Sequence, residues 1–366
     1  MRDWWMNPKK QKHFAPALLI AALAFLFCAA SVLLAPTASA QKIKQLPPPP
    51  PPLRYKPKPT PTPEYEVVKI TSNLVMVPVS VTDAQGQPVL GLKTTDFRVE
   101  EDGRRQELAQ LGDPEQVPLD IAVLIDVSSS VVARFGFEQQ AAAAFLKQVL
   151  KPEDRATVFA IDESPRMIQT LATAQVASQS IMSLKPANGY TAFFDSVLAA
   201  SNYLDKSSTS GRRRIVVVIS DGDDTARIAD LYSKGSTQFS AMENQVRFIE
   251  RAQTETLRDV QRDEVTFYSI NPSGQTMHLN VRTARSEQGM ERIAAATGGA
   301  AFVPKNESEL AGIFNRIAAE IRSQYLLQYY SNNEPSSRAY RRIAVSTPAR
   351  PELRVRSREG YYPKAK

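Results

Sequence analysis

The middle of the chain alternates short apolar runs with longer stretches in which apolar residues recur at helical spacing. The runs are rich in β-branched residues, which is typical of strands buried on both faces. They lie at residues 119–125, 156–161, 214–219, 265–270 and 300–303. Helical patterns separate them, at residues 138–150, 174–184, 192–204, 242–262, a segment ending near 296, and 307–321. This alternation predicts a doubly wound, mostly parallel α/β sheet over residues 114–322.

Both flanks of this region show the two-residue period of half-buried strands instead. In residues 65–113, valines alternate with other residues from position 75 to position 81, and Asp102-Gly103 is a hairpin signal. Residues 323–366 hold three more candidate strands. Because each flank has too few strands for a stable sandwich, we expect them to pair into one small β-sandwich-like module with the α/β domain inserted between them. Removing everything after residue 321 should then lower the protease resistance of residues 65–113.

The first 40 residues have the pattern of an export leader. A basic start precedes a nearly unbroken apolar stretch at residues 17–35, and Ala38-Ser39-Ala40 follows as a small-residue cleavage site. We expect a signal peptide that is removed after Ala40. The alternative is an uncleaved anchor formed by residues 17–35, whose length is sufficient to span a membrane. Either reading predicts that the remainder is extracytoplasmic, in the periplasm or secreted, with contact to the membrane only through an uncleaved leader.

Residues 41–64 are dominated by proline, including an unbroken run at positions 47–52. Such a segment is extended and stiff and forms no core of its own. We interpret it as a proline-rich linker. The alternative is a docking site for a proline-binding module.

Composition narrows the functional classes. The formal net charge is +7, but the leader supplies three of these charges, and the surplus that remains is too small to indicate nucleic-acid binding. The single cysteine, Cys28, lies in the leader, so a disulfide framework is excluded.

Oxygen-bearing side chains follow two of the predicted strands and one loop. Asp126, Ser128 and Ser130 come directly after the first strand, and Asp221 follows the strand at 214–219. Thr191 lies between them, in a loop before a helix. In open α/β sheets, ligands bind beyond the carboxyl ends of the strands, and hard divalent cations prefer oxygen ligands. We therefore predict a metal site at this edge. The alternative is that the hydroxyls only cap a helix.

This constellation resembles the metal-ion-dependent adhesion site of von Willebrand factor type A (VWA) domains. The resemblance covers residues 114–322, and the flanking V-P-V-S-V-T-D, D-F-R-V-E-E-D-G and R-E-G-Y-Y-P segments are similar to an exported bacterial branch of that family. It implies that Ser128, Ser130 and Thr191 ligate the ion directly, while Asp126 and Asp221 act partly through waters. Mg²⁺ is the expected ion, with Mn²⁺ and Ca²⁺ as alternatives, and an open coordination position would accept an Asp or Glu side chain from a protein partner.

We therefore expect a binding protein rather than an enzyme. One alternative is a metal-independent scaffold for envelope assembly. The other is a metal-dependent hydrolase, which would need a general base that the motifs do not supply. His278 is interpreted as a surface residue, Arg212–Arg214 as a solvated basic loop, and Asp223 and Asp224 as solvated loop residues.

Overall fold

The computed structural model describes residues 74–128, 134–233, 238–274, 281–333 and 339–363. The side chains of residues 230–245 and 281–283 are not described. The predicted leader and linker, together with Ser130 and His278, lie outside the described residues. No helix among those that are described has the length and apolar character needed to cross a membrane.

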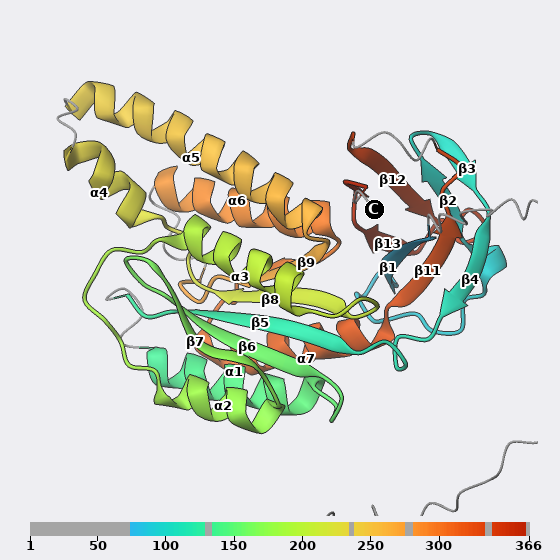
Figure 1. Cartoon of the computed structure of the whole chain (residues 1–366), viewed down its shortest axis with the longest axis horizontal. Helices are drawn as coiled ribbons and strands as arrows, with labels where there is room; N and C mark the ends of the chain where they lie inside the picture. Colours follow the sequence, from blue (N-terminus) through green and yellow to red (C-terminus); the bar gives the residue numbers. More distant parts are fainter. Residues whose placement is uncertain (1–73, 129–133, 234–237, 275–280, 334–338, 364–366) are drawn as a thin grey trace, which may run out of the picture. The chain divides into compact units, whose positions relative to one another are not determined.

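A six-stranded sheet forms the centre of the fold, in the order β10-β9-β8-β5-β6-β7 (Figure 1). All neighbours are parallel except β6 and β7. The central strand β5 is buried along its whole length, which explains its continuous apolar sequence. The doubly wound, mostly parallel sheet is thus confirmed. The strands are β5 (Leu119–Asp126), β6 (Arg155–Ile161), β7 (Pro165–Ala172), β8 (Arg213–Ile219), β9 (Val265–Ile270) and β10 (Ala301–Phe302).

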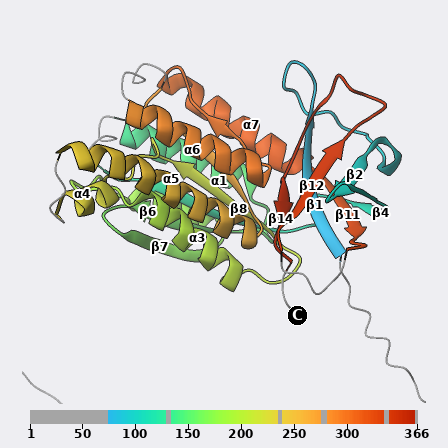
Figure 2. The same ribbon diagram turned by 90° about the horizontal axis from the view of Figure 1, so that it is seen from above.

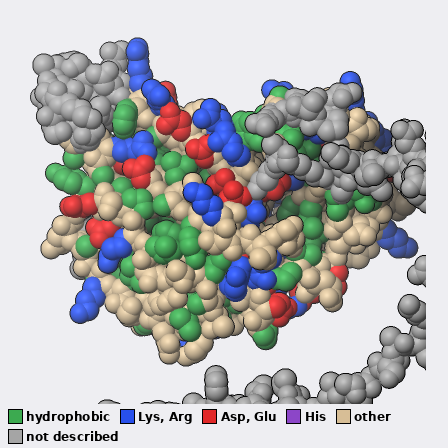
Figure 3. Space-filling model, in the orientation of Figure 1, with side chains coloured by type: hydrophobic (Ala, Val, Ile, Leu, Met, Phe, Trp, Pro, Cys, Tyr) green, Lys and Arg blue, Asp and Glu red, His purple; other side chains and the backbone are tan. Residues whose placement is uncertain are grey.

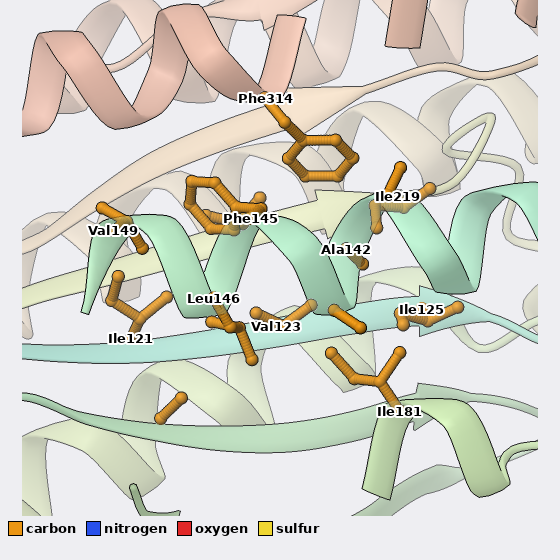
Figure 4. Packing of buried hydrophobic residues seen from close by; sticks show 14 of the residues in the cluster. Ile121, Val123, Ile125, Ala142, Phe145, Leu146, Val149, Ile181, Ile219 and Phe314 are labelled. Atoms are coloured by element: carbon orange, nitrogen blue, oxygen red, sulfur yellow. The ribbon is translucent and has the colours of Figure 1, made fainter. Parts of the chain in front are cut away.

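Helices cover both faces of this sheet (Figure 1). Alternate residues of β5 point to opposite sides, so Val123 packs with α1 and α7, whereas Leu124 packs with α3 and α6. On the first side, the rings of Phe145 and Phe314 meet with their centroids 5.1 Å apart (Figure 4). The helices are α1 (Phe135–Val149), α2 (Ala174–Ser183), α3 (Phe193–Ser207), α4 (Thr225–Ser233), α5 (Gln238–Arg262), α6 (Val281–Thr297) and α7 (Leu310–Ser323).

Strands from the two flanks share two four-stranded sheets, ordered β13-β1-β11-β4 and β14-β12-β2-β3. In the first, β1 lies between β11 and β13 of the carboxyl-terminal flank, with Val77 opposite Leu327. Figure 2 shows β1 beside β11. Side chains from both sheets form one apolar core, so the segments make a β sandwich together. Its strands are β1 (Leu74–Thr82), β2 (Arg98–Glu101), β3 (Arg104–Gln106), β4 (Leu108–Gly112), β11 (Tyr325–Tyr330), β12 (Arg341–Ser346), β13 (Arg354–Ser357) and β14 (Gly360–Tyr361).

A buried carboxylate also joins the two flanks. Glu101 of β2 is fully buried and accepts hydrogen bonds from the hydroxyls of Tyr329 (2.7 Å) and Ser331 (2.6 Å), and from the guanidinium of Arg341 (3.2 Å). Burial alone would raise the pKa of Glu101, but these hydrogen bonds and the charge of Arg341 hold it below its ordinary value.

The expectation of a solvated basic loop at Arg212–Arg214 is wrong. Arg212 donates to Asp120 and Arg213 to the carbonyl of Ile321, so these side chains hold the start of β8 in place. Three of the strands and α-helices had no sequence counterpart: the antiparallel edge strand β7, the helix α4 and the short strand β14. The wider surface carries both signs of charge interspersed, as Figure 3 shows for one face.

Candidate metal centre

The carboxyl ends of β5 and β8 meet at the predicted site. Asp126, the last residue of β5, is fully buried, and its Oδ2 accepts a hydrogen bond of 2.8 Å from the hydroxyl of Ser220. Ser220 follows β8 directly and precedes Asp221. Because the two strands are parallel neighbours, this bond holds Asp221 beside Asp126. Ser220 was not assigned a role from the sequence, although it belongs to the same Ser-Asp-Gly motif.

The turn after β8 depends on Gly222, whose φ is +76°. A Cβ atom there would lie 2.8 Å from the Cε of Met290 in α6. Glycine is therefore favoured by the left-handed backbone conformation, whereas the flexible end of the Met290 side chain could move to admit a Cβ atom. The amide of Gly222 donates to Ser220 Oγ at 3.1 Å, which orients the hydroxyl that binds Asp126.

Ser128 lies next to Asp126 in the loop after β5. Its amide donates to Asp126 Oδ1 at 2.9 Å, and its side chain is buried. Asp126, Ser128 and Asp221 therefore come together as predicted from the strand ends. Ser130 lies outside the described residues, so its place in the site stays a prediction.

Thr191 is attached to the same cluster through its loop. Its amide donates to the hydroxyl of Thr225 at 2.7 Å, just after the Asp221 turn. The amide of Ala187 in the same loop donates to the carbonyl of Val127 at 2.6 Å. The loop is thus bound to both strand ends, and Thr191 is 5 % exposed within it. Beside it in the sequence, Tyr190 is 55 % exposed.

The site contains buried negative charge without a balancing cation. Burial raises the pKa of Asp126, and the neighbouring charge of Asp221 raises it further, while hydrogen bonds from Ser128 and Ser220 oppose both effects. Within the described part of the chain, no Lys or Arg forms an ion pair with Asp126 or Asp221. Two carboxylates and two hydroxyl side chains that lack a protein cation match the oxygen donors that a hard divalent ion prefers.

Asp224 departs from the sequence expectation. It is 2 % exposed rather than solvated, and it accepts the amides of Phe194 (2.9 Å) and Arg227 (3.1 Å) at the starts of α3 and α4. This carboxylate therefore caps two helices near the site. In the described residues, no group of three or more His, Cys, Asp or Glu side chains is arranged to hold a metal ion, so the candidate donor set depends on hydroxyls.

Glu138 of α1 is a buried carboxyl group that the motifs did not reveal. Burial, together with the charges of Asp126, Glu307 and Asp221, raises its pKa to about 8, and Arg134 opposes this rise. The only sequence signal was a Glu at a core-facing position of the predicted helix, and Glu is also common on solvated helix faces.

A comparison with protein families identifies a known domain in the region that contains the candidate site. A family model described as von Willebrand factor type A domain matches residues 121–223, which include Asp126, Thr191 and Asp221. No curated protein matches the chain.

Several solved structures are similar to the chain. One is a mutant of the PilB minor pilin from Streptococcus sanguinis, with a TM-score of 0.44, 15 % identity and coverage of 57 % of this chain and 62 % of that one. Another is von Willebrand factor type A from Catenulispora acidiphila (TM-score 0.41, 14 % identity, 69 % and 51 %). A third is proximal thread matrix protein 1 from the mussel byssus with a zinc occupied MIDAS motif (TM-score 0.42, 12 % identity, 61 % and 50 %). This chain spans less than two thirds of each of these proteins, and such low identities concern the fold alone.

Proposed function

This chain carries a von Willebrand factor type A domain, and from that premise we propose that the domain binds a protein partner through a divalent cation. Ser128, Ser130 and Thr191 would hold the ion directly, and Asp126 and Asp221 would balance its charge, partly through waters. When bound, the ion supplies a positive centre that attracts a carboxylate from the partner. The chain itself positions the oxygen ligands, which come from three separate segments of the sequence.

The observation that carries the proposal is the uncompensated charge of Asp126. This carboxylate is fully buried and lies beside Asp221, and the hydrogen bonds that it accepts from described residues come from hydroxyl and amide groups. Buried carboxylates normally have a cationic partner or lose their charge. A divalent ion would provide that partner, and hydroxyl ligands with few direct carboxylates would leave it able to attract one more acidic group.

Mg²⁺ fits this donor set best, because it keeps several waters and requires few protein carboxylates. Mn²⁺ and Ca²⁺ share the preference for oxygen ligands. The zinc named for the mussel protein makes Zn²⁺ a further ion to test. The partner group we propose is an Asp or Glu side chain on a protein, and the leader and proline-rich segment favour an encounter outside the cytoplasm, in the periplasm or after secretion.

Binding is favoured over metal-dependent hydrolysis because of how Glu138 is enclosed. A hydrolase needs a general base that reaches a metal-bound water. Glu138 is an acid of suitable type, but it is 1 % exposed and faces a cavity of about 10 Å³, which is too small for a substrate. The metal-independent scaffold remains the second function to test, since the β sandwich offers a separate surface.

A metal titration with a matched variant tests the proposal. Mg²⁺ or Mn²⁺ should raise the thermal unfolding temperature of the purified chain, and Asp126→Asn should abolish the rise. A pull-down with and without chelator should then recover a metal-dependent partner. If the unfolding temperature of the wild type does not respond to any of the four ions, the adhesion-site proposal fails and the scaffold is favoured. Metal-dependent turnover of ester or phosphate substrates that disappears in the same variant would favour the hydrolase.

A further inference from the structure

Glu138 is a buried acidic residue that is not among the ligands of the proposed metal site. It lies in the first turn of α1, and neither of its carboxyl oxygens has a hydrogen-bond partner in the described structure. Its ion-pair contact is Arg134, whose Nε lies 3.9 Å away and also lacks a hydrogen bond. Most buried carboxyl groups are hydrogen-bonded, so a group left in this state needs an explanation.

The cavity beside Glu138 has room for about one water molecule. Its volume is about 10 Å³, and it is lined by Phe137, Leu310, two prolines and the exposed Glu307. A water there would give the carboxyl group one hydrogen-bond partner and a route for a proton. Arg134 also lines the cavity, but in the described structure it donates no hydrogen bond to Glu138.

The charged groups that act on Glu138 lie on four different segments of the chain. Asp126 at the end of β5, Asp221 after β8 and Glu307 before α7 are negative, and Arg134 is positive and opposes them. The helix α2, which packs against α1, carries no charged residue. The charged residues of α7 are engaged elsewhere, Arg316 over the ring of Phe302, Glu320 with Arg356 and Arg322 with Asp154.

We infer that Glu138 exchanges its proton for the divalent cation: it is protonated while the site is free of metal and ionised when the ion is bound. On binding, the O–H bond of Glu138 breaks, its electron pair stays on the carboxylate, and the proton passes to solvent. The carboxylate then pairs with Arg134. This inference rests on the proposed metal site, and it makes Glu138 a positioning residue that adjusts the charge behind that site.

Electrostatics gives the direction of the exchange. In the metal-free protein, burial and three nearby carboxylates favour the neutral acid, and they raise the pKa of Glu138 to about 8. A divalent ion between Asp126 and Asp221 reverses the sign of the local charge and lowers that pKa. Between these two pKa values, metal affinity should rise with pH by up to about tenfold per pH unit, since one proton is released for each ion bound.

Calorimetry on the full chain tests the exchange with the metal alone. Mg²⁺ is titrated at pH 7 in buffers of different ionisation enthalpy, and the dependence of the binding heat on that enthalpy gives the number of protons released. We expect close to one proton per ion for the wild type and close to none for Glu138→Gln, with Mg²⁺ still bound. Glu309→Gln is the matched control, because Glu309 is an exposed acidic residue just before α7. It should release as many protons as the wild type.

A second measurement does not depend on the variant folding. The infrared band of a protonated carboxylic acid should be present in the metal-free wild type and should disappear when Mg²⁺ is added. If the wild type binds Mg²⁺ without proton release and without loss of this band, or if Glu138→Gln releases as many protons as the wild type, the inference is overturned and the metal site stands. If the wild type binds no ion at all, both the inference and the proposed function fail.

Discussion

The two ends of strand β5 each carry a fully buried aspartate, and their surroundings are opposite. Asp120, near the start, accepts two hydrogen bonds from Arg155 (2.9 and 2.6 Å) and one from Arg212 (2.8 Å). Burial alone would raise the pKa of Asp120, but the guanidinium groups hold it below its ordinary value. Asp126, at the other end, has no guanidinium partner among the residues that the structure describes, and burial raises its pKa.

Burial alone therefore does not decide the state of a carboxylate in this sheet. At the amino end, the charge is part of the structure, because arginines from β6 and the segment before β8 balance it. At the carboxyl end, the same residue type at the same burial is left with a negative neighbour. The first arrangement stabilises the fold as it stands, and the second is suited to an external cation.

Removal of the two carboxylates should separate the two roles most clearly. Asp120→Asn leaves Arg155 and Arg212 without their charge partner and should lower the free energy of unfolding by about 3 kcal/mol. Asp126→Asn removes an uncompensated charge and should change it by less than about 1 kcal/mol without metal. Urea unfolding of both variants in chelator measures this difference. Equal losses would contradict the comparison.

Added Mg²⁺ should bind only at the carboxyl end of β5, beside Asp126. At a hundredfold excess over its Kd, Mg²⁺ should stabilise the wild type by about 2.7 kcal/mol, a rise of several degrees in unfolding temperature. Asp126→Asn should lose this gain, whereas Asp120→Asn should keep it on its lower baseline. Thermal unfolding with and without Mg²⁺ provides the measurement, and a gain that survives in Asp126→Asn would show that the ion binds elsewhere.

The pH dependence of stability should differ in sign between the two kinds of carboxylate. The pKa values of Asp120 and Glu101 are lowered by folding, so their stabilisation is complete above about pH 5 and is lost as pH falls. The pKa of Glu138 rises from 4.5 to about 8, so its contribution is present below about pH 4.5 and is lost as pH rises to 8. In chelator, the stability of Glu138→Gln relative to the wild type should therefore rise by about 3–4 kcal/mol between pH 5 and pH 8, as measured by urea unfolding at each pH. A constant difference across this range would contradict the raised pKa.

The smallest effect concerns the hydrogen bond that joins the two strand ends. Ser220→Ala removes the donor 2.8 Å from Asp126 and should lower the free energy of unfolding by about 1 kcal/mol. It should also weaken Mg²⁺ binding several-fold, since Asp126 would be less firmly oriented. Ser201→Ala is a suitable control, because the Ser201 hydroxyl donates to Asp263 at 2.7 Å just before β9, and this variant should leave Mg²⁺ affinity unchanged.

Much of this arrangement could be predicted from local patterns. The buried strands of the central sheet are continuous apolar runs, and Asp126 and Asp221 lie at or just after the ends of two of them. Both the sheet and the proximity of these carboxylates could therefore be predicted. The sharing of sheets between the flanks followed from each being too short alone. The edge strand β7 was missed because its sequence, Pro165–Ala172, is mostly exposed and lacks a clear alternation.

The remaining features depend on contacts that no local pattern records. Glu138 lies on a helix whose spacing does not distinguish a buried acid from a solvated one. Arg212–Arg214 looked like a basic loop because Asp120, which accepts from Arg212, lies far away in the sequence. In each case the partner across the fold, rather than the residue itself, determines the state of the charge.

The split β sandwich has a consequence for the order of folding. β1 takes its neighbours from the far end of the chain, and Ser80 bonds with Gln324 across 244 positions. Such long-range contacts are slow to form, because a long loop must close before they contribute. During synthesis from the amino terminus, β2 and β3 can pair with each other, but β1 and β4 must wait for strands of the carboxyl-terminal flank. In the folded protein, the two ends of the inserted domain lie side by side, since Gly112 of β4 is opposite Leu326 of β11. Folding of the inserted domain would therefore bring the two flanks close enough to pair.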